Sequence, residues 1–273
     1  MVNINLQDVT FKLTDLTNLS SYLKTKIFQT FNTVGFFIIE GNDPYQSHEI
    51  FLSLPRYFGK VLNHEQANEH GVIPIWVMPN YPEYVNTKNN DLGLHTDGSF
   101  EKVPPKIMAL YCEVAAQQGG ETQLVDGKSV YEYLAQTDPE ALMTLFEPDV
   151  FSIKRANRSA TRSIFTEDQG RIYMTFRADD DANFSVKPEA SKAFTLIKNF
   201  VADPTQQIIF KLQPNQILVL DNRRILHGRK GFSIHEKRKL HGLWFDGHST
   251  DSPELMMGFV PVCQSLQVNL VTP

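Results

Sequence analysis

Two short stretches, far apart in the chain, carry residue types that together could bind a metal ion. The first, Leu94-His95-Thr96-Asp97-Gly98, offers an imidazole and a carboxylate two residues apart. The second, from Asp221 to Arg229, offers another imidazole, His227, after a short hydrophobic run. Two histidines and one carboxylate on one face of an ion, with the opposite face open, form the ligand set of non-haem Fe(II) oxygenase sites. The sequence therefore predicts that His95, Asp97 and His227 bind iron.

The spacing of His95 and Asp97 fits an extended strand. Residues i and i+2 of a strand point to the same side, so both side chains can reach one ion while Thr96 faces away. On a helix they would lie on different faces. Gly98 lets the chain turn directly after the ligands. A lone His-x-Asp is weak evidence, because roughly one chain in three of this composition contains one by chance, so its neighbours in sequence must carry the argument.

Composition and charge exclude several classes of protein. The chain has 273 residues, 41% hydrophobic and 21% charged, with a net charge of -5, which disfavours binding to nucleic acid. Two cysteines make no disulfide framework, so a reducing cytoplasm is expected. The first residues show neither the basic segment nor the apolar segment of a secretory signal. No apolar run is long enough to span a membrane. We expect one domain over 1–273 and leave the oligomeric state open.

The N-terminal part, about 1–60, is predicted to be largely helical. Apolar residues with a period near four indicate a helix over 17–33, capped by Thr17 or Asn18. A buried strand at 35–40 and a second helix at 44–57 follow. Residues 60–91 are expected to be irregular, and the polar stretch at about 80–91, with Tyr81 and Tyr84, is either a lid over the site or a solvated connector.

The remainder is predicted to be rich in short strands. A turn is expected at Gly119-Gly120, two helices over 128–147 broken near Asp138-Pro139, and a helix at 188–201 within an insertion at about 186–203. The predicted strands are 107–114, 121–125, 149–155, 163–165, 171–177, 208–212, 217–221 and 239–245. This pattern favours a mainly β fold with flanking helices, a jelly-roll barrel whose mouth holds the ligands.

Two further residues suit a dicarboxylate. The Thr122 hydroxyl, after Gly119-Gly120-Glu121, could donate a hydrogen bond to a carboxylate. Arg238, beyond His227, could grip a distal carboxylate through a bidentate, charge-assisted pair.

With these residues in place, the chain resembles the Fe(II)/2-oxoglutarate-dependent oxygenases of the taurine dioxygenase, γ-butyrobetaine hydroxylase and clavaminate synthase superfamily. The matching motifs are His-Thr-Asp-Gly-Ser-Phe at 95–100, Gly-Gly-Glu-Thr at 119–122, Asp-Asn-Arg-Arg-Ile-Leu-His-Gly-Arg at 221–229 and Arg-Lys-Leu-His-Gly at 238–242. The resemblance implies a double-stranded β-helix, a cupin-like fold. It also implies iron at His95, Asp97 and His227, and 2-oxoglutarate at Thr122 and Arg238.

The reaction implied by the resemblance consumes O2 and 2-oxoglutarate and releases succinate and CO2 while a small molecule is oxidised, most commonly by hydroxylation. Asp97 disfavours halogenation, because halogenating relatives have a small residue there. Gly242 stands where the taurine branch has a sulfonate-binding arginine, which disfavours a taurine-like substrate. An amino acid, or a molecule derived from one in a secondary pathway, fits the superfamily best.

The substrate residues are less determined by the sequence. Arg177 could hold a substrate carboxylate or form a surface ion pair with one of Asp179, Asp180 and Asp181. The basic stretch Lys154, Arg155, Arg158 and Arg162 attracts an anionic substrate or is a solvated face. We expect Arg177, Tyr84 and Arg162 to bind substrate.

Two other histidines are not expected to bind metal. His241 should face away from Arg238, and His235 should be exposed in a turn.

Two alternatives to an oxygenase remain at this point. One is a catalytically silent jelly roll that binds a small ligand or a partner protein, although such a protein needs neither the triad nor the oxoglutarate residues. The other is a Zn(II) hydrolase with the same three ligands, although no general base is apparent beside them.

Overall fold

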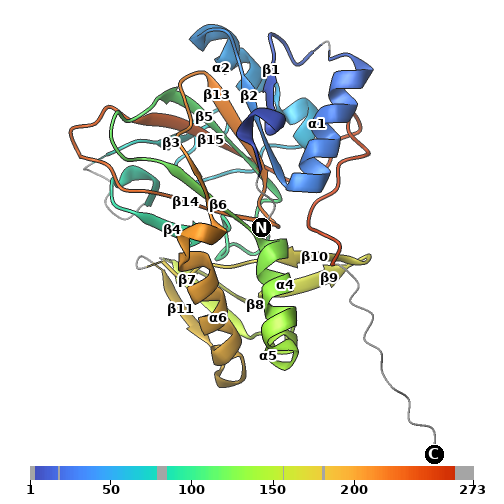
Figure 1. The fold of residues 1–273 in the computed structure, drawn as a ribbon. Coiled ribbons are helices and arrows are strands. Elements are labelled where there is room, and N and C mark those ends of the chain that lie inside the picture. Colours follow the sequence, from blue (N-terminus) through green and yellow to red (C-terminus); the bar gives the residue numbers. More distant parts are fainter. Residues whose placement is uncertain (1–3, 18, 79–84, 156, 180–181, 262–273) are drawn as a thin grey trace, which may run out of the picture.

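The most apolar strands of the sequence form the middle of a six-stranded sheet. The structure, a computed structural model, describes residues 4–17, 19–78, 85–155, 157–179 and 182–261. The order of the strands in this sheet is β1 (Thr10–Lys12), β2 (Phe36–Glu40), β13 (Gln216–Asp221), β5 (Ile107–Val114), β15 (Lys239–Phe245) and β3 (Ile73–Ile75). All neighbours pair antiparallel except β1 and β2. The sheet forms the upper half of the molecule in Figure 1.

A smaller, four-stranded antiparallel sheet carries two of the predicted ligands. Its strand order is β12 (Ile208–Phe210), β6 (Thr122–Asp126), β14 (Ile225–Arg229) and β4 (Leu92–His95), so β4 is an edge strand. His95 lies directly opposite His227 in the pairing of β4 with β14. On the other side of β14, Thr122 of β6 lies opposite Arg229. Because side chains directly opposite each other share a face of the sheet, the interior face of this sheet collects the predicted site residues.

The strict alternation of strand residues divides the apolar side chains between two cores. In β13, Leu218 and Leu220 pack against Leu124 and Ile225 of the smaller sheet, so the two sheets face each other. The intervening residues of the larger sheet, such as Val219, face the other way and pack against the N-terminal helices. These are α1 (Ser21–Val34), α2 (Pro44–Ser53) and α3 (Pro55–Phe58). The arrangement is the predicted mainly β core with flanking helices, a double-stranded β-helix.

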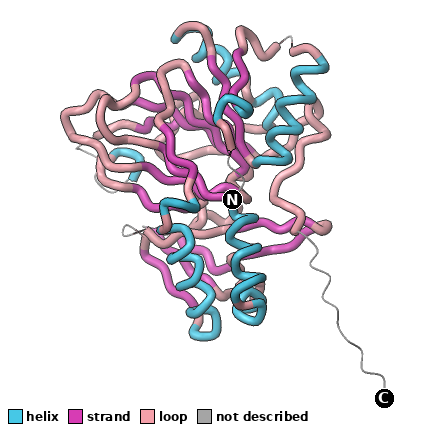
Figure 2. The backbone as a smooth tube through the Cα atoms, viewed as in Figure 1, coloured by secondary structure: helices cyan, strands magenta, loops and turns pink. Residues whose placement is uncertain are grey.

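A long insertion between β6 and β12 forms the lower part of the molecule (Figure 1 and Figure 2). It contains α4 (Gly127–Thr137), α5 (Pro139–Thr144), β7 (Phe151–Arg155), β8 (Arg158–Arg162), β9 (Phe165–Asp168), β10 (Arg171–Met174), β11 (Asn183–Val186) and α6 (Ser191–Ala202). Strand β7 lies between β11 and β8, and β9 pairs with β10. A third core joins this insertion to the outer face of the smaller sheet through Leu94, Val125 and Leu226. Four short 3-10 helices complete the described elements: η1 (Leu6–Val9), η2 (Val85–Thr87), η3 (Pro188–Ala190) and η4 (Pro204–Gln206).

Several predicted boundaries needed correction. Helix α1 is capped by Ser20, whose hydroxyl accepts from the amide of Leu23 at 3.3 Å, rather than by Thr17, which bonds Asp15 instead. Asn18, the other predicted cap, lies outside the described residues. The predicted helix at 44–57 is two helices because Pro55 starts a new one. The predicted break at Asp138-Pro139 is confirmed.

The strand predictions failed mainly in the insertion and in the connector at 60–91. Strands β8 and β11 were not predicted, and the strand predicted at 163–165 is β9, which only begins at Phe165. The short strand β3 lies in the stretch expected to be irregular. Half-buried β8 carries Arg158, Ala160 and Arg162 on one face, a pattern too polar to predict a strand. Among the described residues no helix is long and apolar enough to cross a membrane.

Gly228 lets β4 approach β14 closely. A Cβ atom added to Gly228 would lie 2.6 Å from the carbonyl oxygen of Leu92, a backbone atom that cannot move independently of its strand. We predict that Gly228→Ala lowers the free energy of unfolding by about 1–3 kcal/mol, the usual cost of overpacking a buried site. Urea denaturation measures the change. Ser159→Ala, at an exposed position of β8, is the control, for which a change within about 0.5 kcal/mol is expected. Equal stabilities for the two variants would contradict the close approach.

Candidate active site

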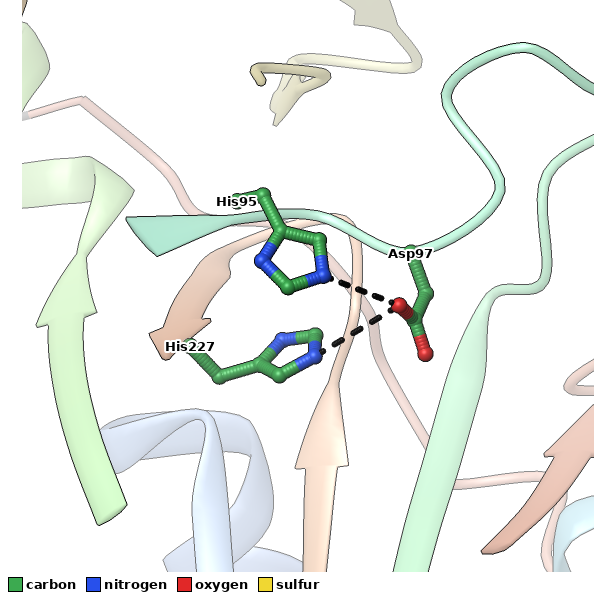
Figure 3. Close-up of side chains that lie close together, drawn as sticks. All are labelled: His95, Asp97 and His227. Carbon is green, nitrogen blue, oxygen red and sulfur yellow. Dashed lines mark hydrogen bonds and ion pairs between the residues drawn. The ribbon is translucent and has the colours of Figure 1, made fainter. Parts of the chain in front are cut away.

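His95, Asp97 and His227 converge on one point in the mouth of the barrel. Their candidate ligand atoms all lie within 4.8 Å of one another. The Oδ1 atom of Asp97 lies 3.1 Å from Nε2 of His95 and 3.6 Å from Nε2 of His227. Figure 3 shows both rings pointing toward the carboxylate. Three ligands on one face of an octahedral ion would be about 3 Å apart for bonds of about 2.1 Å, so a small contraction accommodates an ion.

The backbone fixes the orientation of two of these ligands. The Nδ1 atom of His95 lies 2.8 Å from the carbonyl oxygen of Gly93, which leaves Nε2 to face the ion. Asp97 comes just after β4 ends, and Asn222 holds its backbone there. The Asn222 amide oxygen accepts from the Asp97 N–H at 2.7 Å, and its nitrogen donates to the carbonyl oxygens of Asp97 and Pro105. Gly98 follows with φ +66°, the predicted turn.

The electrostatics of the triad suit a divalent cation. Burial opposes ionisation of Asp97, but the two neighbouring imidazoles outweigh it and hold the pKa of this carboxyl well below its usual value. Burial, and then the charge of His227, lowers the pKa of His95. Asp97 is therefore ionised and His95 neutral at pH 7, the protonation states that metal binding requires. The Nδ1 atom of His227 is buried and has no hydrogen-bond partner among the described residues.

Arg238 and Thr122, the residues predicted to hold a dicarboxylate, both lie next to Arg229, which follows His227 by two residues on β14. Arg238, directly before β15, is buried, and its Nη1 has no hydrogen-bond partner within the described ranges. Gly120, with φ +70°, makes room for it, since an added Cβ would lie 3.1 Å from the Arg238 Cδ. Burial lowers the pKa of Arg238 to about 10 and raises that of the nearby Cys112 thiol to about 12. Both pKa values leave Arg238 charged and Cys112 neutral at pH 7, so the thiol does not neutralise the arginine.

Arg229 is a second cation beside Arg238, and it was not predicted. We call Thr122, Arg229 and Arg238 the arginine cradle. It lies two residues after His227 on the same face of β14, opposite Thr122. Its guanidinium and that of Arg238 both lie over the ring of Phe232, at 5.1 and 5.4 Å from the centroid. Burial, and then the charge of Arg238, lowers the pKa of Arg229 to about 10. One nitrogen donates to the carbonyl oxygen of Asn90, while the buried Nε has no hydrogen-bond partner in the described part of the chain.

This cradle passes a structural test for a dicarboxylate co-substrate. Two buried guanidiniums that form no ion pair with a carboxylate among the described residues are costly unless an anion binds there. The period-2 pattern of β14 contained the signal for Arg229, because a residue two positions after a ligand on a strand must share its face.

A pocket opens beside the triad, with Asp97 in its wall. It is lined by His64, Ile73, Ile75, Asn86, Asp97, Gly98, Phe100, Met108, Arg155, Arg177, Gly242 and Trp244. The side chain of Asp97 is 19% exposed, against 1% for His95, so the carboxylate is the ligand that meets this pocket. The pocket combines apolar walls with a few polar groups, as small-molecule sites generally do.

Of the residues predicted to bind substrate, Arg177 lines the pocket and Arg162 does not. Arg177 lines the pocket and is bridged to His95 through the backbone, but it is buried and paired with Asp179 at 2.7 Å. Of the basic stretch, Arg155 lines the pocket, whereas Arg162 donates to the carbonyl oxygen of Glu101. Tyr84 and Tyr81 lie outside the described residues.

The described end of the candidate lid is held in place by hydrogen bonds. The carbonyl oxygen of Asn89 accepts from the Phe232 amide, and the side-chain amide of Asn89 donates to the Phe232 carbonyl oxygen, both at 2.9 Å. Asp91 accepts from the amide of Gly231, and Asn86 donates to Gln66 and Pro74. Asn89 and Asp91 are therefore attached to the loop that precedes Arg238, and Asn86 is attached to the segment at 66–74. His235 is exposed, and His241 faces outward against Tyr111, as predicted.

Residues 3–244 match the family described as "Taurine catabolism dioxygenase TauD, TfdA family". A uridine-5'-phosphate dioxygenase of an Amycolatopsis species is 26% identical over 157 residues, which are 54% of this chain and 57% of that protein. Human γ-butyrobetaine dioxygenase is 28% identical over 174 residues, 57% of this chain and 44% of that protein. The chain spans about half the length of the curated relatives it matches.

Solved structures share the fold. The non-haem iron oxygenase OrfP, in complex with iron and α-ketoglutaric acid, aligns with a TM-score of 0.65 and 15% identity over 88% of this chain and 87% of that one. An asparagine oxygenase in complex with Fe(II), hydroxyasparagine and succinate aligns with a TM-score of 0.61 and 18% identity over 83% and 79% of the two chains. At these identities the likeness concerns the fold alone.

The triad predicts a metal-binding defect when its carboxylate is removed. Asp97→Ala leaves only the two imidazoles as ligands, so we expect the affinity for Fe(II) to fall by more than about 100-fold under anaerobic conditions. Isothermal titration calorimetry measures the affinity. Asp168→Ala, which removes an exposed carboxylate on β9, is the matched control and should bind Fe(II) as the wild type does. Wild-type affinity in the Asp97 variant would place the metal elsewhere.

Proposed function

The chain belongs to the TauD/TfdA dioxygenase family, and from this premise we propose that it oxidises a small, anionic amino acid or amino-acid derivative, most simply by hydroxylation. As a member of this family it is a non-haem Fe(II)- and 2-oxoglutarate-dependent dioxygenase. The observation that carries the proposal is the convergence of the His-Asp-His triad, the arginine cradle and the pocket.

His95, Asp97 and His227 would hold the iron. Thr122 and Arg238 would hold the distal carboxylate of 2-oxoglutarate, with Arg229 contributing a second positive charge. When bound, iron and 2-oxoglutarate together supply the oxidising chemistry, in which O2 is consumed and succinate and CO2 are released. The protein's own part is to fix the ligands, neutralise the co-substrate and line the pocket with apolar side chains that exclude water.

The pocket supports a substrate with an anionic group. Arg155, whose guanidinium lies 5.2 Å from the centroid of the Phe100 ring, brings a positive charge to the pocket wall, as does Arg177, which is paired with Asp179. Burial, and then the charge of Arg177, lowers the pKa of Arg155, so an anionic group nearby would favour its charged form. Asparagine, γ-butyrobetaine and uridine 5'-phosphate, which the names of similar proteins mention, each carry a carboxylate or phosphate.

Alternatives to this reaction lose their support. Family membership together with the converging triad favours an enzyme over the silent jelly roll. A Zn(II) hydrolase has no use for a cradle of two buried arginines beside its metal.

The first test is an anaerobic titration of the protein with Fe(II) and then 2-oxoglutarate, followed by absorption in the visible range. A weak charge-transfer band upon addition of 2-oxoglutarate is expected, and a shift of this band screens candidate amino acids. Iron binding without a band would refute the assignment of the co-substrate site.

The arginine cradle predicts weaker co-substrate binding when either charge is removed. Arg238→Gln and Arg229→Gln should each raise the dissociation constant for 2-oxoglutarate by about 10–100-fold, since a hydrogen bond to a charged group contributes about 1.5–3 kcal/mol. The anaerobic titration of the Fe(II) band measures this constant. Arg158→Gln is the control, because Arg158 pairs with Glu65 and Glu101 away from the cradle. If Arg229→Gln binds 2-oxoglutarate normally, Arg238 alone holds the carboxylate.

The pocket predicts that Arg155 selects for the anionic group. For a panel of L-amino acids and their methyl esters, wild-type protein should prefer the free acids. Arg155→Gln should lose about 10-fold or more of this preference, again from one charge-assisted hydrogen bond. It should retain slow, substrate-independent conversion of 2-oxoglutarate to succinate. Arg158→Gln is again the control. An unchanged preference in the Arg155 variant would assign the anion to another group.

A further inference from the structure

The two oxygens of Asp97 have different surroundings. Oδ1 lies 3.1 and 3.6 Å from the Nε2 atoms of His95 and His227, where the metal would be. Oδ2 points away from both rings, as Figure 3 shows, and accepts a hydrogen bond from the indole Nε1 of Trp244 at 2.9 Å. The indole therefore engages the oxygen that does not face the histidines.

Trp244 is held firmly in its position. It lies on β15, opposite Met108 of β5, and its side chain is 7% exposed on the interior face of the larger sheet. Its carbonyl oxygen accepts from the amide of Leu62 at 2.8 Å. The ring of His64 packs edge-on against the indole, with centroids 4.8 Å apart. An indole held by backbone pairing and ring packing can fix the direction of the carboxylate that it contacts.

The direction of this carboxylate matters for coordination. Three protein ligands leave three positions on an octahedral ion, and a chelating 2-oxoglutarate fills two of them. A freely rotating carboxylate could bind through both oxygens and occupy the last position. A donor on Oδ2 prevents this, because the oxygen that accepts the indole proton is held away from the ion.

We propose that Trp244 is a positioning residue that keeps Asp97 bound to the metal through one oxygen. This inference rests on the proposed function only in that the triad holds the metal. Trp244 also lines the pocket beside the triad, so its hydrogen bond would keep the second oxygen of Asp97 away from a metal held there, on the side that faces this pocket.

The test uses Co(II) as the probe, because its visible absorption reports the number of ligands. Trp244→Phe removes the N–H donor and keeps an aromatic ring. We expect the Co(II) dissociation constant to rise about 10-fold, the lower end of the effect for a group that orients a ligand. The d–d spectrum of Co(II) should change because Asp97 would bind through both oxygens. The affinity for 2-oxoglutarate should also fall. Trp76→Phe is the matched control: Trp76, the other tryptophan, packs against His241 on the outer face.

The outcomes separate the two proposals. Tight Co(II) binding by wild type, with an unchanged affinity and spectrum in Trp244→Phe, overturns the role of Trp244 and leaves the metal site standing. Failure of the wild type to bind Co(II) overturns both. If Trp244→Phe lowers the urea midpoint, 3-benzothienylalanine replaces Trp244, since its sulfur removes the N–H while preserving the shape. The same affinity loss and spectral change in that variant support the proposal, and wild-type behaviour overturns it.

Discussion

The site depends on the pairing of β4 with β14, which places His95 directly opposite His227. Directly opposed residues of antiparallel strands lie within about 5.5 Å of each other, and here the two imidazole centroids are 4.5 Å apart. The backbone thus delivers two ligands at nearly the right separation before any ion binds. The third ligand, Asp97, lies just past the end of its strand and needs separate restraints, from Asn222 on its backbone and from Trp244 on its carboxylate.

Charge is arranged around this pair in a consistent way. The triad carries one ionised carboxylate, and the flanking cradle carries two buried guanidiniums with unused donors. A folded chain with such groups forgoes stability that a dicarboxylate and a cation would restore together. The arrangement explains why Gly120 and Gly228 must remain small: one leaves space for Arg238, and the other lets β4 approach the strand that carries His227.

The sequence predicted the strands of the core and the three side chains that converge as candidate ligands, because both follow from local patterns. Apolar runs such as 107–114 and 217–221 match their strands closely, and the His-x-Asp spacing matches strand geometry. The contributions of Trp244 and Asn222 could not be predicted in the same way, since each depends on a partner distant in the chain, and the basic stretch at 154–162 did not single out Arg155 as the residue that lines the pocket. Trp244 appears in sequence only as part of the apolar run Leu243-Trp244-Phe245. Strand β8 was missed because its half-buried residues are mostly polar, and β11 because its alternation of polar and apolar residues spans only four positions.

The position of β4 at the edge of its sheet has a consequence for the protein without its metal. Among the described strands β4 pairs with β14 alone, over a short and irregular register, and its outer edge has only an isolated backbone bridge from His95 to Arg177. An ion held by His95 and His227 is a cross-link between this edge and the sheet. Without that cross-link, the edge can fray and expose unpaired backbone groups, which are templates for pairing with other chains. Iron would therefore protect the protein against self-association as well as serve its chemistry, and preparations depleted of metal would be the more prone to aggregate.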